Sequence, residues 1–383
     1  MEGWILDNFG NCLKLKSGDA LTAKNMIPGK YPVYGGNGIA GYHNDFNLSG
    51  KHIIIGRVGA LCGNARFINE KIWLTDNAFK VSEFNYDFDL EFLQYLLNYF
   101  DLRSFARQSA QPVISNSSLK AANLRFPSSL PEQKQIVALL DQAFAAIDQA
   151  KANLEKNIEN AKELFQSKLN AIFSQRGEGW EEKTLNQICE KTKNIRWQEN
   201  EGVYFQYIDL SSVSRETLSV TKTSTVSHET APSRAKKIVK KGDVIFATTR
   251  PTLKRATIID ERLNLQICST GYVVLRPKVK TNSHWIFFYL LTTKFMDRME
   301  SLQRGASYPA VTDSDVKYSK LSVPLLVEVE KNNILLMNQL REGTSDLILS
   351  YHQKLDSLEE LKKSILQKAF SGKLTGKSAV ASE

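Results

Sequence analysis

Two long segments of the chain repeat apolar residues at steps of three, four or seven, the spacing of a narrow apolar stripe on an α-helix. The first runs from Glu132 to about Ser174, and its stripe includes Leu140, Phe144, Ile147, Leu154, Ile158 and Phe165. The second lies near the C-terminus, with Leu347, Tyr351, Leu355, Leu358, Leu361 and Ile365. A helix of about 40 residues is roughly 60 Å long. We predict two long helices, each of which must bury its stripe against a partner.

Short β-rich runs, separated by Gly and Asn turns, precede each long helix. They cover residues 52–55, 65–68 and 78–81 in the first half, and 243–246, 256–259 and 271–274 in the second. A shorter helix is expected after each set, over residues 90–105 and 283–302. Each half therefore begins with a globular domain of mixed α and β structure, and the predicted fold class is α+β.

The two halves of the chain resemble each other. Gly3-Trp4 recurs as Gly179-Trp180, and the segments 111–115 and 163–169 recur at 308–312 and 360–366, at spacings that grow from 176 to 197 residues. A spacing that only grows is what small loop insertions in a duplicated unit produce. Two similar units joined head to tail close most economically by pseudo-twofold symmetry. The two long helices are therefore predicted to pack as an antiparallel coiled coil.

The charge distribution raises the prospect of a nucleic-acid partner. The net charge is only +9, but residues 232–255 hold eight basic residues and one acid, Asp243. The four cysteines are far apart, which favours free thiols. No apolar run is long enough to span a membrane, and the first residues lack the pattern of a signal peptide, so a cytoplasmic protein is expected.

Motifs that would carry catalysis are not convincing. Gly36-Asn37-Gly38-Ile39-Ala40-Gly41 fits a dinucleotide fingerprint, but no long strand leads in and no helix leads out, so a glycine-rich turn that presents Tyr34 and Asn37 is preferred. Gly372–Ser378 is one residue too short for a phosphate-binding loop. The five histidines show no metal-ligand spacing, and no motif for holding a flipped base is present. We expect no catalytic site and no metal site.

The loops between the predicted strands and helices suit a DNA-binding protein better. They are rich in the side chains that contact phosphates and base edges, and they differ between the two halves more than the framework does. For any one of these residues, an ordinary surface loop is as good an explanation as a DNA contact. The candidate DNA-binding residues are Tyr34, Asn37, Lys51, Arg57, Asn64, Arg66, Arg107, Gln108, Gln111, Asn116, Arg196, Tyr207, Thr249, Arg250, Lys254, Arg255, Arg304, Ser307 and Tyr308.

Several of these segments resemble the specificity subunits of type I restriction–modification systems. The stretch 130–141, which begins Leu-Pro-Glu-Gln-Lys-Gln, is similar to the one that ends each target recognition domain in that family, and residues 358–374 resemble its C-terminal conserved helix. Gly3-Trp4, Gly179-Trp180 and the loop 109–115 also fit. The second half departs from the pattern, because residues 323–330 stand in place of the Pro-Glu-Gln stretch. The start of the second long helix is less well defined for that reason.

The resemblance implies an organisation and a function. Residues 1–130 and 177–327 would be two pseudo-symmetric target recognition domains, 131–176 and 328–375 the conserved helices, and 376–383 a tail. Such a subunit reads a bipartite target in double-stranded DNA and docks two methyltransferase subunits and the restriction subunits. It catalyses nothing itself, and it binds no cofactor: S-adenosylmethionine, ATP and Mg²⁺ belong to the partner subunits.

Two other functions remain open at this point. A coiled-coil interaction or structural protein without sequence-specific DNA binding would explain the apolar stripes, but not the duplicated domains with divergent loops. An enzyme that combines recognition and catalysis in one chain would need a catalytic site that the sequence does not display.

Overall fold

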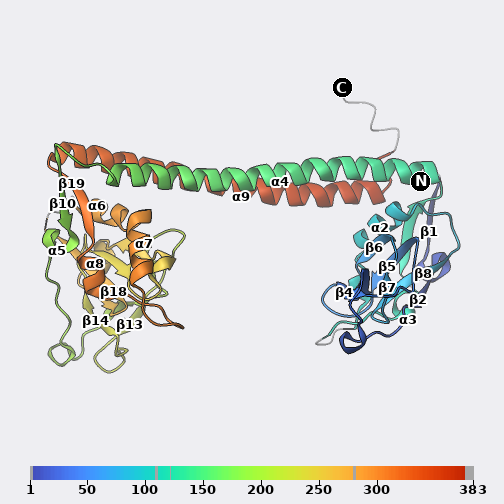
Figure 1. Ribbon diagram of the computed structural model, residues 1–383, viewed down its shortest axis with the longest axis horizontal. Helices are drawn as coiled ribbons and strands as arrows, with labels where there is room; N and C mark the ends of the chain where they lie inside the picture. Colours follow the sequence, from blue (N-terminus) through green and yellow to red (C-terminus); the bar gives the residue numbers. More distant parts are fainter. Residues whose placement is uncertain (1–2, 108–110, 121, 279–281, 376–383) are drawn as a thin grey trace. The chain divides into compact units, whose positions relative to one another are not determined.

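The computed structural model describes residues 3–107, 111–120, 122–278 and 282–375 (Figure 1). Internal contacts divide the chain into two compact units. Unit 1 comprises Met1–Leu154 and Gln353–Glu383, and unit 2 comprises Glu155–His352. Each unit therefore holds one globular domain together with part of both long helices.

Unit 1 is built on an antiparallel sheet in the order β2 (Leu13–Ser17), β8 (Ala78–Phe84), β5 (Lys51–Gly56) and β6 (Ala65–Asn69). Ile53, Ile54 and Ile55 of the central strand β5 are fully buried, because both faces of the sheet are covered. Alternate side chains point to opposite faces of a strand. Ile53 and Ile55 therefore join the core shared with helix α2 (Leu90–Tyr99), whereas Ile54 joins a core on the other face.

Unit 2 repeats this sheet in the same order, with β11 (Cys189–Glu190), β18 (Tyr272–Pro277), β15 (Val244–Ala247) and β16 (Ala256–Ile258). Its central strand β15 is buried on both faces in the same alternating way. Helices α6 (Asn282–Tyr289) and α7 (Thr293–Leu302) take the place of α2. The predicted duplication and the predicted mixed α and β domains are confirmed.

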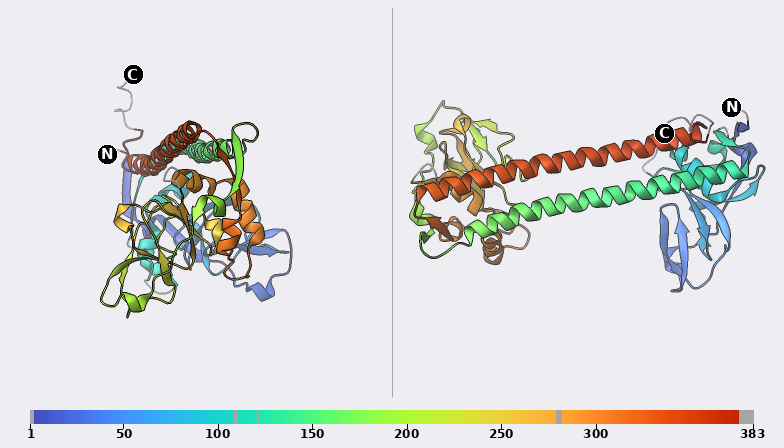
Figure 2. Two further views of the ribbon diagram at one scale, coloured as in Figure 1. Left: turned by 90° about the vertical axis from the view of Figure 1, so that its left-hand side faces the viewer. Right: turned by 90° about the horizontal axis from the view of Figure 1, so that it is seen from above.

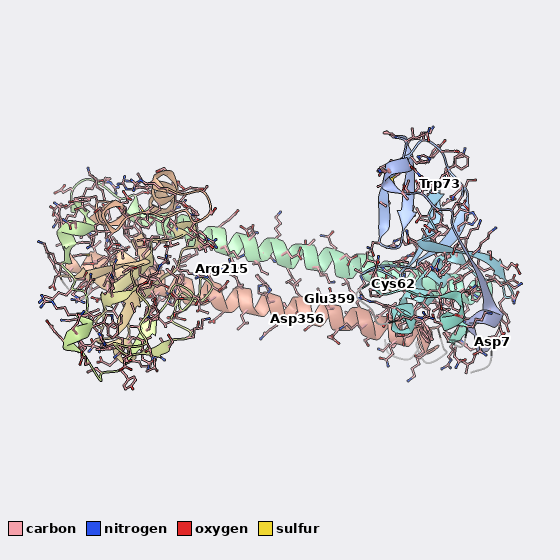
Figure 3. All side chains as sticks on the ribbon, turned by 90° about the horizontal axis from the view of Figure 1, so that it is seen from below. Asp7, Cys62, Trp73, Arg215, Asp356 and Glu359 are labelled. Carbon is pink, nitrogen blue, oxygen red and sulfur yellow. The ribbon has the colours of Figure 1, made fainter. Side chains whose placement is uncertain are left out.

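A second sheet covers the other face of the main sheet in each unit, with three strands in unit 1 and four in unit 2. In unit 1 the order is β4 (Gly38–His43), β3 (Tyr31–Gly35) and β7 (Trp73–Leu74). In unit 2 it is β13 (Ser224–Val226), β12 (Phe205–Ile208), β17 (Ile267–Ser269) and β14 (Ala235–Ile238). The parallel pairings β3–β7 and β12–β17 are equivalent, whereas β14 corresponds in unit 1 only to the isolated antiparallel bridge between Leu48 and Ile72. Figure 3 marks Trp73 in the second sheet of unit 1, on the side of that unit away from the long helices.

The two-stranded sheets and the short helices also come in equivalent pairs. The two-stranded sheets β1 (Trp4–Asn8) with β9 (Asn123–Pro127) and β10 (Trp180–Thr184) with β19 (Lys320–Pro324) connect each domain to its long helix. The short helices are α1 (Phe9–Cys12), α5 (Leu185–Ile188), α3 (Asn116–Leu119) and α8 (Asp313–Lys317). Single 3₁₀ turns are η1 (Ala23–Asn25), η2 (Leu102–Phe105), η3 (Trp197–Glu199), η4 (Pro251–Leu253) and η5 (Glu261–Leu263).

The long helices α4 (Leu130–Phe173) and α9 (Val327–Phe370) each contain 44 residues and run side by side (Figure 2). In unit 1, Lys151 pairs with Glu359 and Lys362 lies 3.7 Å from Asp148, so positions rise along one helix as they fall along the other. In unit 2, Leu169 and Ile172 of α4 share a core with Met337 of α9. The antiparallel coiled coil is confirmed.

The predicted stripe is correct on α4 and wrong at two positions on α9. Leu140, Phe144, Ile147 and Ile158 are buried, while Leu154, Phe165, Tyr351, Leu355, Leu358 and Ile365 are half-buried. Leu347 and Leu361, however, are 43% and 47% exposed. The stripe passes instead through Ile348 and Lys362. Between Leu358 and Ile365, helical steps of three and four fit Leu361 and Lys362 equally well. Lys362 is the residue that packs against α4, because its ammonium lies 4.6 Å from the centre of the Phe144 ring.

The shorter helices predicted over 90–105 and 283–302 are both interrupted. In the first, Asp101 adopts a left-handed conformation with φ of 50°, which ends the α-helix before the 3₁₀ turn η2. In the second, Thr292 is extended, and its side chain accepts a hydrogen bond from the Phe295 amide and caps a new helix. Each prediction joined two elements because the apolar spacing continues across the break.

Candidate nucleic-acid interface

Two loops meet at the end of the central strand β5 in unit 1. One follows β5 and runs from Arg57 to Asn64; Cys62, labelled in Figure 3, belongs to it. The other precedes α3, and we describe it from Arg107 and from residues 111–115. The amide of Ile114 donates to the Arg57 carbonyl at 2.9 Å, and the amide of Gly59 donates to the Pro112 carbonyl at 3.0 Å. We call this pair, and its equivalent in unit 2, the paired loops.

Unit 2 repeats the same backbone pattern at the end of β15. The amide of Val311 donates to the Thr248 carbonyl at 2.9 Å, and that of Arg250 donates to the Pro309 carbonyl at 2.7 Å. The bonds from Arg107 to Val113 in unit 1 and from Arg304 to Ala310 in unit 2 also correspond, at 3.0 and 2.9 Å. The two copies therefore hold equivalent loops in one backbone frame, although most of the side chains on that frame differ.

The paired loops of unit 1 gather several predicted contact residues. Asn64, Arg107 and Gln111 are exposed, and Arg57 is half-buried with its guanidinium 5.3 Å from the Phe79 ring centre. The β3–β4 turn joins them, because the Asn37 Oδ1 accepts a hydrogen bond from the Leu61 amide at 2.9 Å. Asn37 thus fastens the turn to the first loop. Arg66, on the neighbouring strand β6, lies beside the same turn at Gly38.

Two of these arginines carry unused donors. Arg57 Nε and Arg66 Nη1 are buried nitrogen atoms that have no hydrogen-bond partner among the described residues. An unsatisfied guanidinium nitrogen is unfavourable in the free protein. Both side chains therefore keep a hydrogen-bond donor that the described residues leave unpaired.

The paired loops of unit 2 gather Thr249, Arg250, Lys254, Arg304, Ser307 and Tyr308. Tyr308 is 69% exposed, and the Arg250 guanidinium lies 4.8 Å from its ring centre. Arg304 Nη1 lies 3.2 Å from the Asp315 carboxylate, so part of its charge is already paired. Hydrogen bonds to Thr312 hold the pKa of that carboxyl below its usual value.

Four of the predicted contact residues that the structure describes do not join the paired loops. Lys51 begins β5 and therefore lies at the opposite end of that strand from Arg57. Asn116 donates to the Leu15 carbonyl at 3.4 Å, and Arg196 pairs with Glu199 at 2.9 Å. Arg255 turns inward, where its Nη1 donates to the Leu210 carbonyl. Gln108 lies outside the described residues.

Tyr34 and Tyr207 were predicted to face DNA, and this was wrong for both side chains as they stand. They are only 9% and 4% exposed: Tyr34 belongs to the core between the two sheets of unit 1, and Tyr207 to a core on the face of the second sheet of unit 2 that points away from the main sheet. Burial raises the pKa of both phenols above its ordinary value. The glycine-rich turn after Tyr34 suggested a loop, but Tyr34 lies on β3, where alternate side chains point into the core.

The basic run 232–255 is partly neutralised inside unit 2. Lys237 pairs with Asp313 at 2.6 Å and Lys241 with Glu261 at 2.6 Å. The single acid of the run, Asp243, is buried and pairs with Arg276 at 2.7 Å. Besides Lys241, the exposed cations of this run are Arg234, Lys236, Lys240, Arg250 and Lys254.

Two basic residues near the paired loops escaped the sequence prediction. In unit 1, Arg103 lines a cavity of about 220 Å³ beside Leu61 and Asn64. It falls within the helix predicted over residues 90–105, and only the break at Asp101 could have shown that Arg103 lies near these loops. In unit 2, the Arg234 carbonyl accepts from the Thr270 amide at 2.8 Å, next to Gly271, whose carbonyl accepts from Thr248. Arg234 counted toward the basic run but was not singled out.

The described residues contain no group of three or more His, Cys, Asp or Glu placed to hold a metal ion. All four cysteines lie in the described part of the chain as buried free thiols, and burial raises the pKa of Cys12, Cys189 and Cys268 to about 12. Such thiols are poor nucleophiles. Among the helices of the described ranges, none is long and apolar enough to cross a membrane.

Comparisons with known proteins agree on one family of DNA specificity subunits. The profile of a family described as "Type I restriction modification DNA specificity domain" matches residues 2–160 and 177–360. The type I restriction enzyme EcoprrI specificity subunit of Escherichia coli is 31% identical over 166 residues, which cover 40% of this chain and 41% of that protein. The EcoDI specificity subunit of Escherichia coli is 24% identical over 412 residues, covering 97% of this chain and 89% of that protein.

Solved structures show a similar fold. A chain from a study of complex assembly and conformational transition of the type I R-M system has a TM-score of 0.76 at 15% identity, covering 98% of this chain and 99% of that one. The HsdS subunit from Thermoanaerobacter tengcongensis has a TM-score of 0.62 at 17% identity, covering 98% of each chain.

Proposed function

Because the chain belongs to the type I restriction-modification DNA specificity family, whose members are non-catalytic recognition subunits, we propose that it reads a bipartite target in double-stranded DNA. Each unit reads one half of the target through its paired loops. The chain docks two methyltransferase subunits and the restriction subunits, and these partners bring S-adenosylmethionine, ATP and Mg²⁺. The complex works in the cytoplasm.

The matched backbone of the paired loops carries this proposal. Three equivalent hydrogen bonds hold the loops in both units, so the frame presents side chains in the same way. The presented side chains differ: Gly59 and Gln111 in unit 1 stand where unit 2 has Arg250 and Tyr308. A shared frame with different side chains is what two readers of different base sequences require, since base edges specify and the backbone only positions.

The exposed cations near the loops supply affinity. Each phosphate neutralised by Lys or Arg releases counterions, so binding weakens steeply as salt rises. The coiled coil supplies the spacing between the two half-sites: each helix of 44 residues is about 66 Å long, and paired helices resist bending better than a loop. A fixed spacing then makes the gap in the DNA target constant.

The test uses the full chain together with its modification subunits. Binding is selected from duplex DNA that carries two randomised blocks with variable spacers, at about 50 and 200 mM salt. The expected result is one bipartite motif with one spacer length, and an affinity that falls at least tenfold between the two salt concentrations. Binding without any sequence preference, or no binding at all, would favour the coiled-coil interaction protein instead.

A matched pair of variants locates the surface. Arg107 lies in the paired loops and Lys51 lies at the other end of β5, and both are exposed. Arg107→Ala is expected to weaken binding about three- to tenfold, whereas Lys51→Ala leaves it within about twofold. An equal effect of the two changes would contradict the placement of the interface at the paired loops.

A further inference from the structure

The loop after the central strand has the same length in both units and turns at the same two positions. In unit 1 these positions are Gly59 and Gly63, with φ of 100° and 89°. In unit 2 the equivalent residues are Arg250 and Lys254, with φ of 50° and 54°. Both copies therefore need a positive φ twice, and only unit 1 uses glycine for it.

This choice is costly for the backbone of unit 2. Glycine adopts a positive φ without strain, whereas a side chain with a Cβ atom clashes with its own carbonyl there. The frame itself accepts glycine, as unit 1 demonstrates. Strain of this kind is retained where the side chain has a use. Arg250 and Lys254 are thus present for what their side chains do, not for the turn.

Arg250 is also held in one orientation. Its amide donates to the Pro309 carbonyl at 2.7 Å, so the loop that bears Arg250 is fastened beside the loop that bears Tyr308. Its guanidinium lies over the Tyr308 ring at 4.8 Å, and Tyr308 is 69% exposed. Stacking of this kind fixes the plane of the guanidinium. Among the described residues, the Arg250 side chain has no ion pair or hydrogen bond, in contrast to Arg255 and Arg304.

The asymmetry between the units favours a base over a phosphate as the ligand. The phosphate backbone is the same in both half-sites, so a phosphate contact from this frame would be useful in both units. A base contact changes with the sequence that is read. At this position unit 1 has Gly59, and opposite it Gln111 replaces Tyr308. The planar fork of arginine matches the O6 and N7 acceptors of guanine in the major groove.

We propose that Arg250, oriented by Tyr308, reads a guanine in the half-site bound by unit 2. This assignment rests on the proposed function and adds to it which residue reads which base. Tyr308 is a positioning residue: it holds the guanidinium plane and leaves the donors of the fork free. Lys254, a compact charge on a flexible stem, contributes to affinity without base preference.

The experiment repeats the selection from randomised duplex DNA with the full complex and its Arg250→Gly, Arg250→Lys and Lys254→Gly variants. Arg250→Gly restores the residue that the frame carries in unit 1, so its melting temperature is expected to equal or exceed that of the unmodified chain. It is expected to lose on the order of ten- to hundredfold of the preference for guanine at one position of one half-site. Arg250→Lys loses most of this preference too, because it keeps the charge but not the fork.

Lys254→Gly is the matched control, since it removes an equal charge and the same kind of strain from the same loop. It is expected to weaken binding to all sequences alike and to leave every base preference in place. Tyr308→Leu is expected to reduce the guanine preference, and Tyr308→Phe, which keeps the ring, is expected to restore it.

The outcomes separate the inference from its premise. If the unmodified chain selects a bipartite motif and Arg250→Gly selects the identical motif, Arg250 does not read a base. The same conclusion follows if Arg250→Gly lowers the affinity for all sequences equally. No motif at all for the unmodified chain overturns the proposed function itself, and this inference with it.

Discussion

Gly63 shows how closely the backbone of unit 1 is packed at the paired loops. Its φ is 89°, and a Cβ atom built on it would lie 2.6 Å from the Arg103 amide nitrogen. Gly50 shares the left-handed conformation, with φ of 92°, but no atom lies within 4 Å of its Cβ position. An alanine at Gly50 would therefore be strained only by the positive φ, whereas an alanine at Gly63 would also clash with neighbouring backbone atoms.

Gly63→Ala is expected to lower the free energy of unfolding by about 3 kcal/mol, of which about 1–2 kcal/mol comes from the positive φ and the rest from the displaced backbone. Gly50→Ala should cost only about 1 kcal/mol, because its site is open. Urea denaturation of both variants measures the difference. Equal losses would show that the neighbouring backbone yields without cost.

Glu330 is a second residue whose environment predicts a measurable effect. It is 5% exposed, and burial raises the pKa of its carboxyl above the ordinary value. Its counterpart in unit 1 is Gln133, whose amide donates to the Asp87 and Pro127 carbonyls at 3.0 Å. Unit 1 thus uses an uncharged side chain at the same helix start.

Because burial favours the protonated form, folded Glu330 keeps its proton at pH values where the unfolded chain has lost it. The free energy of unfolding therefore falls as the pH rises from below the unfolded pKa through the raised folded pKa. Glu330→Gln removes this loss, so its advantage over the unmodified chain is expected to be larger at about pH 7 than at about pH 4. Denaturation at both pH values tests this, with the exposed Glu328→Gln as control. A difference that does not change with pH contradicts it.

At the scale of elements, the coiled coil shows which apolar residues stabilise the chain. Leu140 on α4 is fully buried, whereas Leu361 on α9 is 47% exposed although its spacing fits an apolar stripe. Lys362 lies between the two helices in place of Leu361. Its ammonium lies over the Phe144 ring and 3.7 Å from the Asp148 carboxylate. A long cationic side chain can cover apolar surface and keep its charge in water.

Leu140→Ala is expected to lower the free energy of unfolding by about 3 kcal/mol, because it leaves a cavity in a closed core. Leu361→Ala makes the same chemical change on a surface position and should cost less than about 0.5 kcal/mol. Thermal or urea denaturation of the two variants provides the comparison. A large loss of stability in Leu361→Ala would show that Leu361 is buried between the two helices.

At the scale of the whole molecule, duplication predicts that the two readers are separable. Each globular domain has its own core and its own paired loops. Replacement of residues 1–130 by the corresponding domain of a relative is therefore expected to change one half of the bound motif and leave the other half unchanged. Selection from randomised DNA reports both halves at once. A change in both halves would count against independent readers.

The duplication, the two long helices, the antiparallel pairing and the mixed α and β domains could all be predicted from the sequence. These features depend on local periodicity and on residues that recur at a regular spacing, as Gly3-Trp4 and Gly179-Trp180 do. Much of the candidate interface could also be predicted from the sequence. Its residues Arg107, Gln111, Arg250 and Tyr308 lie in loops that differ between otherwise similar halves.

The tertiary structure alone decided which side chains these loops present. Tyr34 and Tyr207 are core residues because strand alternation points them inward, and Lys51 is remote because it starts the strand that Arg57 follows. Helical spacing allows either Leu361 or Lys362 to face the partner helix, and the contact with Phe144 shows that Lys362 does so. Periodicity fixes what an element is, whereas the surface that packs against it fixes which of its faces is buried, and that surface comes from residues far away in the chain.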